Sequence, residues 1–182
     1  MISDEAKSLV SLVASFVLFF LAIGIGIISL NKRQDAVAIA ATEIYTAKLL
    51  WYDKAEFIYK ESNKNSDIDM TSYLTSISKS RSFYKRLISN IRNGEPEVTQ
   101  PLHAIEKYNV YWALEYPQSA IKQRKDIQKT LSDMNDLEKQ MIDAIINYNV
   151  LAKKYNRRIT WSLLNILIRK PRYPLLNPSL DE

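Results

Sequence analysis

The sequence predicts an all-α protein whose N-terminal transmembrane helix continues into an antiparallel bundle of three or four long helices. Three observations predict this class. Residues 9–30 form an unbroken apolar run, apolar residues recur every three or four positions through most of the remainder, and glycine occurs only 3 times in 182 residues. No stretch has the period-two alternation that is typical of a strand. Long helices with short connections pack as antiparallel bundles, with seams like those of a coiled coil.

The run Leu9–Leu30 is the candidate membrane span, and residues 1–8 are its N-terminal flank. It contains serine but no charged residue. At about 1.5 Å per residue it measures roughly 33 Å as a helix, enough to cross a hydrocarbon core of about 30 Å. A buried core helix is the alternative, but charge-free runs of this length are rare in soluble proteins. A signal peptide would have a shorter apolar region and a small-residue cleavage site, so we expect an uncleaved anchor.

Basic residues near the two ends of the run predict its orientation. Lys7 precedes the run, whereas Lys32 and Arg33 follow it directly. The positive-inside rule then places the C-terminal domain in the cytoplasm and the N-terminus outside. We expect a single-pass protein of the inner (cytoplasmic) membrane or of an intracellular organelle membrane.

Small residues recur along one face of the predicted span. Such residues let two transmembrane helices approach closely and offer hydroxyl groups for interhelical hydrogen bonds. The alternative is that serine, alanine and glycine are simply common in these helices. We take the stripe as a candidate self-association face, formed by Ser11, Ser15, Ala22 and Gly26.

The bundle is expected over residues 31–159, and its first two helices are separated by a polar turn. The anchor helix continues to about Ser62 with a regular apolar stripe, and the cluster SNKNSD follows it. A second helix begins near residues 66–69, where serine or aspartate side chains can accept hydrogen bonds from free N–H groups. It ends at Asn93-Gly94, because glycine adopts the left-handed conformation without steric cost.

Proline residues delimit the remaining two helices. Pro101 is expected to open a short third helix, and Pro117 ends it at Tyr116 because the residue before a proline avoids the helical region. The expected buried edge of this helix is Leu102, Ile105, Tyr108 and Trp112. A fourth helix over about 118–159 has one unbroken apolar seam, namely Ile127, Leu131, Met134, Leu137, Met141, Ile145, Tyr148, Ala152, Tyr155 and Ile159.

The tail, residues 160–182, is apolar and basic. Its first part, WSLLNILIRK, is apolar on nearly every face, and seven basic residues but no acidic one lie between Lys153 and Arg172. One interpretation packs the apolar residues onto the open end of the bundle. The other lays them in the bilayer interface, with tryptophan and basic side chains at headgroup level. The candidate membrane-surface residues are Trp161, Arg169, Lys170 and Arg172.

Several residues of the third and fourth helices resemble a known family. Tyr116-Pro117 separates these helices, and two Tyr-Asn pairs, Tyr148-Asn149 and Tyr155-Asn156, lie seven residues apart before the apolar and basic tail. This pattern, strongest over Ala113–Tyr173, is similar to the C-terminal part of LemA-family proteins. The Tyr-Asn pair of the first helix and the Arg-Arg…Ile-Pro-Asn-Leu stretch of that family are absent. The resemblance implies a divergent, membrane-anchored, oligomeric four-helix bundle of bacterial envelopes or magnetosome membranes, without catalytic activity.

The Tyr-Asn pairs also have a physical interpretation of their own. A spacing of seven residues puts Tyr148 and Tyr155 on one helix face, with their rings in the seam. Asn149 and Asn156 lie one step round the helix, where they can bond a neighbouring helix or chain. The pairs are either a structural packing motif or a ligand-contacting site.

The composition excludes several kinds of chemistry. The chain has no cysteine, and His103 is its one histidine, so neither the paired Glu-x-x-His units of a di-iron bundle nor a cysteine nucleophile can be formed. No phosphate-binding glycine loop or nucleophile elbow is present. His103 and Glu106 are expected to share a surface hydrogen bond. We expect no enzyme activity, no metal, no cofactor and no nucleic acid partner.

These observations lead to the hypothesis of a non-catalytic scaffold. The anchor fixes the bundle to a bilayer, further copies bind through the small-residue face and the bundle surface, and the assembly shapes or organises the membrane. An accessory subunit that binds a specific membrane protein or peptide is the first alternative. A small-molecule sensor in the bundle core, lined by the Tyr-Asn pairs, is the second.

Overall fold

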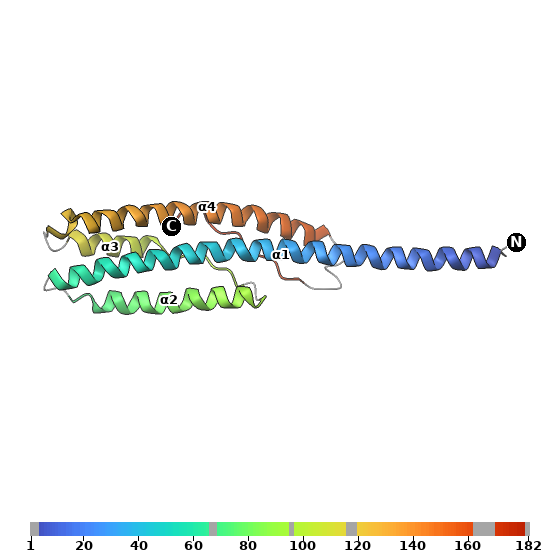
Figure 1. The fold of residues 1–182 in the computed structure, drawn as a ribbon, viewed down its shortest axis with the longest axis horizontal. Coiled ribbons are helices and arrows are strands. Elements are labelled where there is room, and N and C mark those ends of the chain that lie inside the picture. Colours follow the sequence, from blue (N-terminus) through green and yellow to red (C-terminus); the bar gives the residue numbers. More distant parts are fainter. Residues whose placement is uncertain (1–3, 66–68, 95–96, 116–119, 162–169, 181–182) are drawn as a thin grey trace.

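The computed structural model confirms the all-α class (Figure 1). It describes residues 4–65, 69–94, 97–115, 120–161 and 170–180, and no strand occurs in these ranges. The helices are α1 (Asp4–Asn65), α2 (Thr71–Arg92), α3 (Ala104–Glu115) and α4 (Lys125–Trp161), with a short 3-10 helix, η1 (Ala120–Gln123), before α4.

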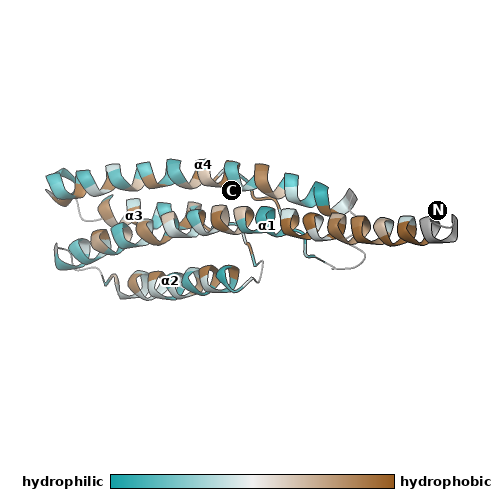
Figure 2. Ribbon diagram, turned by 45° about the vertical axis from the view of Figure 1, so that its right-hand side comes forward, coloured by the Kyte–Doolittle hydropathy of each residue, from teal (hydrophilic) through white to brown (hydrophobic). Residues whose placement is uncertain are grey.

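The central element is α1, a single helix of 62 residues. At about 1.5 Å per residue it is roughly 93 Å long. Its first part is long and apolar enough to cross a membrane, and none of its most apolar stretch is buried, unlike the core helix of a soluble protein, although a signal sequence would have the same features. Figure 2 shows this apolar part projecting beyond the bundle. Burial in the bundle begins at Leu30, which is 3% exposed.

The long seam between α1 and α4 forms the core, as the periodicity predicts. All but Leu131 of the apolar residues expected in the α4 seam are buried. On α1 the buried stripe includes Val37, Ala41, Ile44, Ala47, Trp51, Ala55 and Ile58. The regular spacing of these residues turns one face of each helix toward the other over almost the whole bundle.

The second helix, α2, packs mainly on α1, and the ring of its Tyr73 also lies 5.9 Å from that of Trp112 in α3. It buries Ile77, Tyr84, Leu87 and Ile91. The carboxylate of Asp69 accepts a hydrogen bond of 2.9 Å from the Thr71 N–H at its start, which is one of the expected caps. Gly94, with φ of 86°, follows its end as predicted.

The third helix differs from the prediction in its start and in its buried face. It begins at Ala104, because residues 97–103 are not helical and their backbone is held by tyrosine hydroxyls. The Thr99 N–H donates to Tyr45 (2.7 Å), and the Leu102 N–H donates to Tyr84 (3.2 Å). The expected edge is wrong, since Leu102, Ile105 and Tyr108 are exposed and Trp112 is only partly buried. The buried residues are Val110, Ala113 and Leu114.

The C-terminal segment, residues 170–180, lies against the bundle without helical structure. It buries Tyr173, Leu176 and Leu180, so this part of the tail belongs to the bundle core. Residues 162–169 lie outside the described residues, and with them the first part of the apolar tail.

Candidate functional site

The two asparagines of the Tyr-Asn pairs bind the backbone of the C-terminal segment. The Asn156 amide donates to the carbonyl of Tyr173 (2.7 Å) and accepts from its N–H (3.0 Å). Asn149 makes the same pair of hydrogen bonds with Leu176, at 2.6 and 2.9 Å. Each side chain therefore satisfies both main-chain polar groups of one residue. The predicted partner was a neighbouring helix or chain, whereas the partner found is a non-helical segment of the same chain.

A third amide extends this arrangement. Gln100 donates to the carbonyl of Asn177 (3.0 Å) and accepts from its N–H (2.8 Å). We call Asn149, Asn156 and Gln100 the amide clamp. The hydroxyl of Tyr148 adds a hydrogen bond of 2.7 Å to the carbonyl of Pro174. Gln100 was not recognised in the sequence because it lies in a loop, without any periodic signal.

The spacing of the clamp follows from helix and chain geometry. Seven residues of helix, from Asn149 to Asn156, rise about 10.5 Å. Three residues of an extended chain, from Tyr173 to Leu176, cover about 10 Å. The two distances match, so successive buried residues of the segment meet successive asparagines. Pro174, which has no N–H, lies between them and leaves no donor unpaired.

The tyrosines of the pairs are buried beneath the segment. Tyr148 and Tyr155 are both fully buried, and the Tyr155 ring lies 5.3 Å from that of Tyr173, edge to face. Burial raises the pKa of Tyr148 and raises the pKa of Tyr155 to about 12, so both hydroxyls are protonated at neutral pH. These positions therefore form a packing motif that holds the C-terminal segment.

A second polar cluster is centred on Lys48 of α1, which is fully buried. Its ammonium group lies 2.6 Å from a carboxylate oxygen of Glu106 and 2.9 Å from Nδ1 of His103. It also lies 4.5 Å from the ring centroid of Trp51 and 4.9 Å from that of Tyr52. A charge-paired lysine between two aromatic faces compensates for much of the desolvation that burial imposes.

The cluster continues to α4 through His103. Its Nε2 lies 3.1 Å from Oε1 of Glu138, whose other oxygen accepts a hydrogen bond of 2.7 Å from Lys107. Because Lys48 donates to Nδ1, the neutral imidazole carries its proton on Nε2, which faces Glu138. We call Lys48, His103, Glu106, Lys107 and Glu138 the buried ion network; its two ammonium groups balance its two carboxylates.

Burial and hydrogen bonds shift the pKa values in this network. Burial lowers the pKa of His103 below its usual range, although Glu138 opposes the shift. Burial would raise the pKa of Glu138, but hydrogen bonds from His103 and Lys107 lower it to about 2. Burial also lowers the pKa of Lys48. The expected surface hydrogen bond between His103 and Glu106 is wrong, since His103 is 2% exposed and joins Glu138 and Lys48 instead.

A groove runs between α1 and α4, next to the end of α2. Its volume is about 890 Å³. The floor and walls contain Ala38, Ala47 and Ala144, and carboxylates of three acidic residues line it. The complete lining is Asp35, Ala38, Ile39, Thr42, Glu43, Thr46, Ala47, Leu50, Ile91, Arg92, Gln140, Asp143, Ala144 and Asn147. Nothing in the apolar pattern of a single helix indicates this groove, because three helices form it.

The other predicted site residues fall into two groups. Ser11, Ser15 and Ala22 are exposed on the apolar part of α1 and Gly26 is partly exposed there, while the Ser15 hydroxyl bonds the Ser11 carbonyl of its own helix (2.9 Å). Lys170 donates to Gln34 (2.8 Å) and Arg172 to Thr160 (3.3 Å). Tyr116, Pro117, Arg169 and the side chain of Trp161 lie outside the described residues.

Among the described residues, no group of three or more histidine, cysteine, aspartate or glutamate side chains could hold a metal ion. No family model, curated protein or solved structure matches the chain.

Proposed function

We propose that this chain is a membrane-anchored, non-catalytic helical scaffold that self-assembles at a membrane, as its resemblance to LemA-family proteins implies. The observation that carries the proposal is the continuity of α1. One helix contains both the exposed apolar part and the central stripe of the bundle core. With no break between them, the bundle stands directly on the bilayer that holds the apolar part.

Charge at the end of the apolar part supports this placement. Lys32 and Arg33 of α1 and Arg157 and Arg158 of α4 are exposed. Figure 1 shows the end of α4 beside the region of α1 where the apolar part ends, and Lys170 bonds Gln34 in the same region. Basic residues at this level favour the anionic headgroups of a cytoplasmic leaflet, because each contributes about 1 kcal/mol of attraction.

Exposed apolar residues on the bundle support contacts with other proteins. Leu102, Ile105 and Tyr108 on and just before α3 are 74%, 77% and 68% exposed. The groove between α1 and α4 adds Ile39 and Leu50, which are also exposed. Exposed apolar side chains are a feature of surfaces that bind other proteins. Further copies of the chain are the simplest partners of a membrane scaffold.

Membrane fractionation of the full chain tests the anchor. The protein is expected in the membrane pellet after an alkaline carbonate wash, and release into the supernatant would contradict the proposal. Leu18→Arg should weaken this retention, since a central arginine costs about 2.5–3.5 kcal/mol on insertion scales. Asn135→Arg, on the exposed side of α4, is the matched control and should remain in the pellet.

The mass of the full chain in mild detergent tests self-assembly. We expect an oligomer at micromolar concentration by light scattering, and a clean monomer would contradict the scaffold proposal. The accessory-subunit alternative is favoured by the groove alone. A photo-crosslinker at Ile39 separates the two functions, because a scaffold gives products of the chain with itself and an accessory subunit gives one foreign band.

A further inference from the structure

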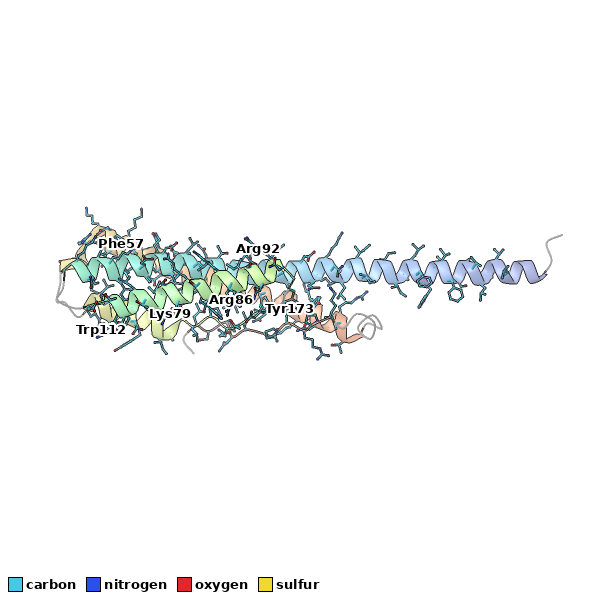
Figure 3. The ribbon with its side chains drawn as sticks, turned by 90° about the horizontal axis from the view of Figure 1, so that it is seen from below. Phe57, Lys79, Arg86, Arg92, Trp112 and Tyr173 are labelled. Atoms are coloured by element: carbon cyan, nitrogen blue, oxygen red, sulfur yellow. The ribbon has the colours of Figure 1, made fainter. Side chains whose placement is uncertain are left out.

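The outer face of α2 is strongly basic. Within Thr71–Arg92 the chain has no acidic residue, and its basic residues are Lys79, Arg81, Lys85, Arg86 and Arg92. Arg81 turns toward α1 and pairs with Asp53 and Glu56. Lys79, Lys85 and Arg86 are exposed and form the basic face, whereas Arg92, also exposed, lines the groove between α1 and α4 of its own chain. Figure 3 shows Lys79, Arg86 and Arg92 along the length of this helix.

This basic face also has an apolar centre. The guanidinium of Arg86 lies 5.5 Å from the ring centroid of Phe83, which is 36% exposed. A shallow depression of about 450 Å³ surrounds them, lined also by Ser78, Lys79 and Ser82. An exposed aromatic ring flanked by arginine and lysine is typical of protein interfaces, where aromatic residues and arginine are enriched.

The groove between α1 and α4 has the opposite charge. Asp35, Glu43 and Asp143 line it, and all three are exposed, whereas Arg92 is the only cation among its lining residues. Between the carboxylates, small side chains leave room for a helix to approach closely. The groove is therefore complementary in charge to the basic face of α2.

The two surfaces overlap in height along α1. The ring of Tyr84, next to Phe83, lies 5.5 Å from the ring of Tyr45 and 5.9 Å from that of Tyr52. The groove is lined by α1 residues from Asp35 to Leu50, so the basic face overlaps its end near Leu50. Because all copies are anchored by the same helix, the overlapping parts of the two surfaces stand at one distance from the bilayer in neighbouring copies.

We propose that the basic face of α2 docks into the acidic groove between α1 and α4 of a second copy. This inference rests on the proposed self-assembly and names the surfaces that perform it. Since the two surfaces are different, the contact is heterologous and repeats from copy to copy, in a ring or along a row, in contrast to a closed two-fold dimer. Oppositely charged surfaces also fix the register and disfavour wrong pairings.

Cysteine crosslinking of the full chain in nanodiscs or detergent tests the contact, since the chain has no cysteine of its own. Leu50→Cys marks the end of the groove and Ser82→Cys marks the α2 face, both at exposed positions and at similar heights along α1. When the two single variants are mixed, we expect a disulfide-linked dimer between them. Salt at about 0.5 M should reduce its yield, because it screens the charges.

Charge reversal makes the test specific. Glu43→Lys with Asp143→Lys reverses the groove, and Lys79→Glu with Arg86→Glu reverses the α2 face. Either pair alone should lower the crosslinked yield by at least about tenfold, because like charges across an interface cost several kcal/mol. Crosslinking should return when the reversed groove with Leu50→Cys is mixed with the reversed α2 face with Ser82→Cys.

The control reverses charge elsewhere: Glu115→Lys with Asp136→Lys, both exposed, should leave the yield unchanged. A yield that is insensitive to the groove and α2 reversals would overturn the contact, as would failure of the two reversed variants to recover it together. The mass in detergent separates this failure from that of the proposed function. An oligomer that survives both reversals refutes this contact only, whereas a monomeric wild type refutes self-assembly as well.

Discussion

At the scale of single residues, Lys48 is the position that most needs polar partners, because its charged group is fully buried. A fully buried ammonium group interrupts the apolar stripe of α1, with the carboxylate of Glu106 and the ring of His103 as its partners. Both partners come from around the start of α3, so the lysine ties a short helix to the central one. Removal of Lys48 leaves the Glu106 carboxylate without its ion-pair partner, and breaking a buried pair in this way costs more than the pair itself contributes.

Lys48→Met should therefore lower the free energy of unfolding by about 3–5 kcal/mol, the range for breaking a buried ion pair. Chemical denaturation of the full chain in detergent, followed by circular dichroism, measures this. Lys54→Met is the matched control on the same helix, since Lys54 pairs with Asp133 (2.6 Å) while its side chain is 38% exposed. It should cost less than about 1 kcal/mol. Equal losses in the two variants would show that burial of Lys48 has no special role.

Acidification should destabilise the bundle through the same network. Below its ordinary pKa of 6.5, His103 takes up a proton in the unfolded chain, whereas the folded imidazole, with a lowered pKa, stays neutral. The unfolded state then binds more protons, so stability is lost as pH falls below about 6.5. Glu138 acts in the same direction between its ordinary pKa of 4.5 and its folded value of about 2.

Comparison of wild type with His103→Gln isolates the histidine contribution. The loss of unfolding free energy between pH 7.5 and pH 5.5 should be smaller in the variant, because the amide does not titrate. Denaturant midpoints of the full chain at the two pH values give this difference. The same pH dependence in both proteins would show that His103 does not contribute.

Single residues also show where sequence reasoning works. The positions of Tyr148 and Tyr155 in the seam follow from their spacing, which any helix imposes on side chains seven residues apart. The buried network could not be predicted in this way. Lys48 and His103 are 55 residues apart in sequence, and a charged residue in an apolar stripe gives no indication of which distant partner neutralises it.

At the scale of elements, α3 shows how a loop decides the rotation of a short helix. Its apolar residues are spread around the helix, so periodicity alone does not identify the buried face. Tyrosine hydroxyls hold the preceding loop, and His103 enters the core just before the helix starts. These contacts turn Val110 and Leu114 inward and leave Ile105 outside. In a long helix such as α4, a contact at one end has little influence on the orientation of the many other turns. Its seam was therefore predictable.

The amide clamp should determine the order of the C-terminal segment. In the double variant Asn149→Ala with Asn156→Ala, the backbone of Tyr173 and Leu176 loses four hydrogen bonds. Each contributes about 0.5–1.5 kcal/mol. Hydrogen–deuterium exchange of residues 173–180 in the full chain should become faster, while exchange in the middle of α4 should stay slow.

Asn135→Ala, at an exposed position of the same helix, is the control for this variant and should leave exchange unchanged. Unaltered protection of residues 173–180 in the double variant would show that apolar burial alone holds the segment. The segment could not be placed from the sequence because an extended chain rich in proline has no helical period. The sequence predicted only that the side chains of the two asparagines can hydrogen-bond a group outside their own helix.

At the scale of the whole molecule, the fold class and the course of the long helices were predictable because two different patterns agree. A charge-free run and a stripe of period 3.6 adjoin without a helix breaker, so one helix contains both. The groove and the basic face were not predictable in the same manner. They depend on where α2 ends and on how far it lies from α4, which are properties of the packed assembly.

The unbroken course of α1 has a mechanical consequence. From Leu30 to the end at Asn65, the helix reaches roughly 52 Å beyond the apolar part. Under the proposed anchoring, the tilt of α1 would follow bilayer thickness, and a change of about 10° would move the distal tip sideways by about 9 Å. A long, unbroken helix of this kind would turn a small difference in bilayer thickness into a displacement of the bundle relative to neighbouring molecules.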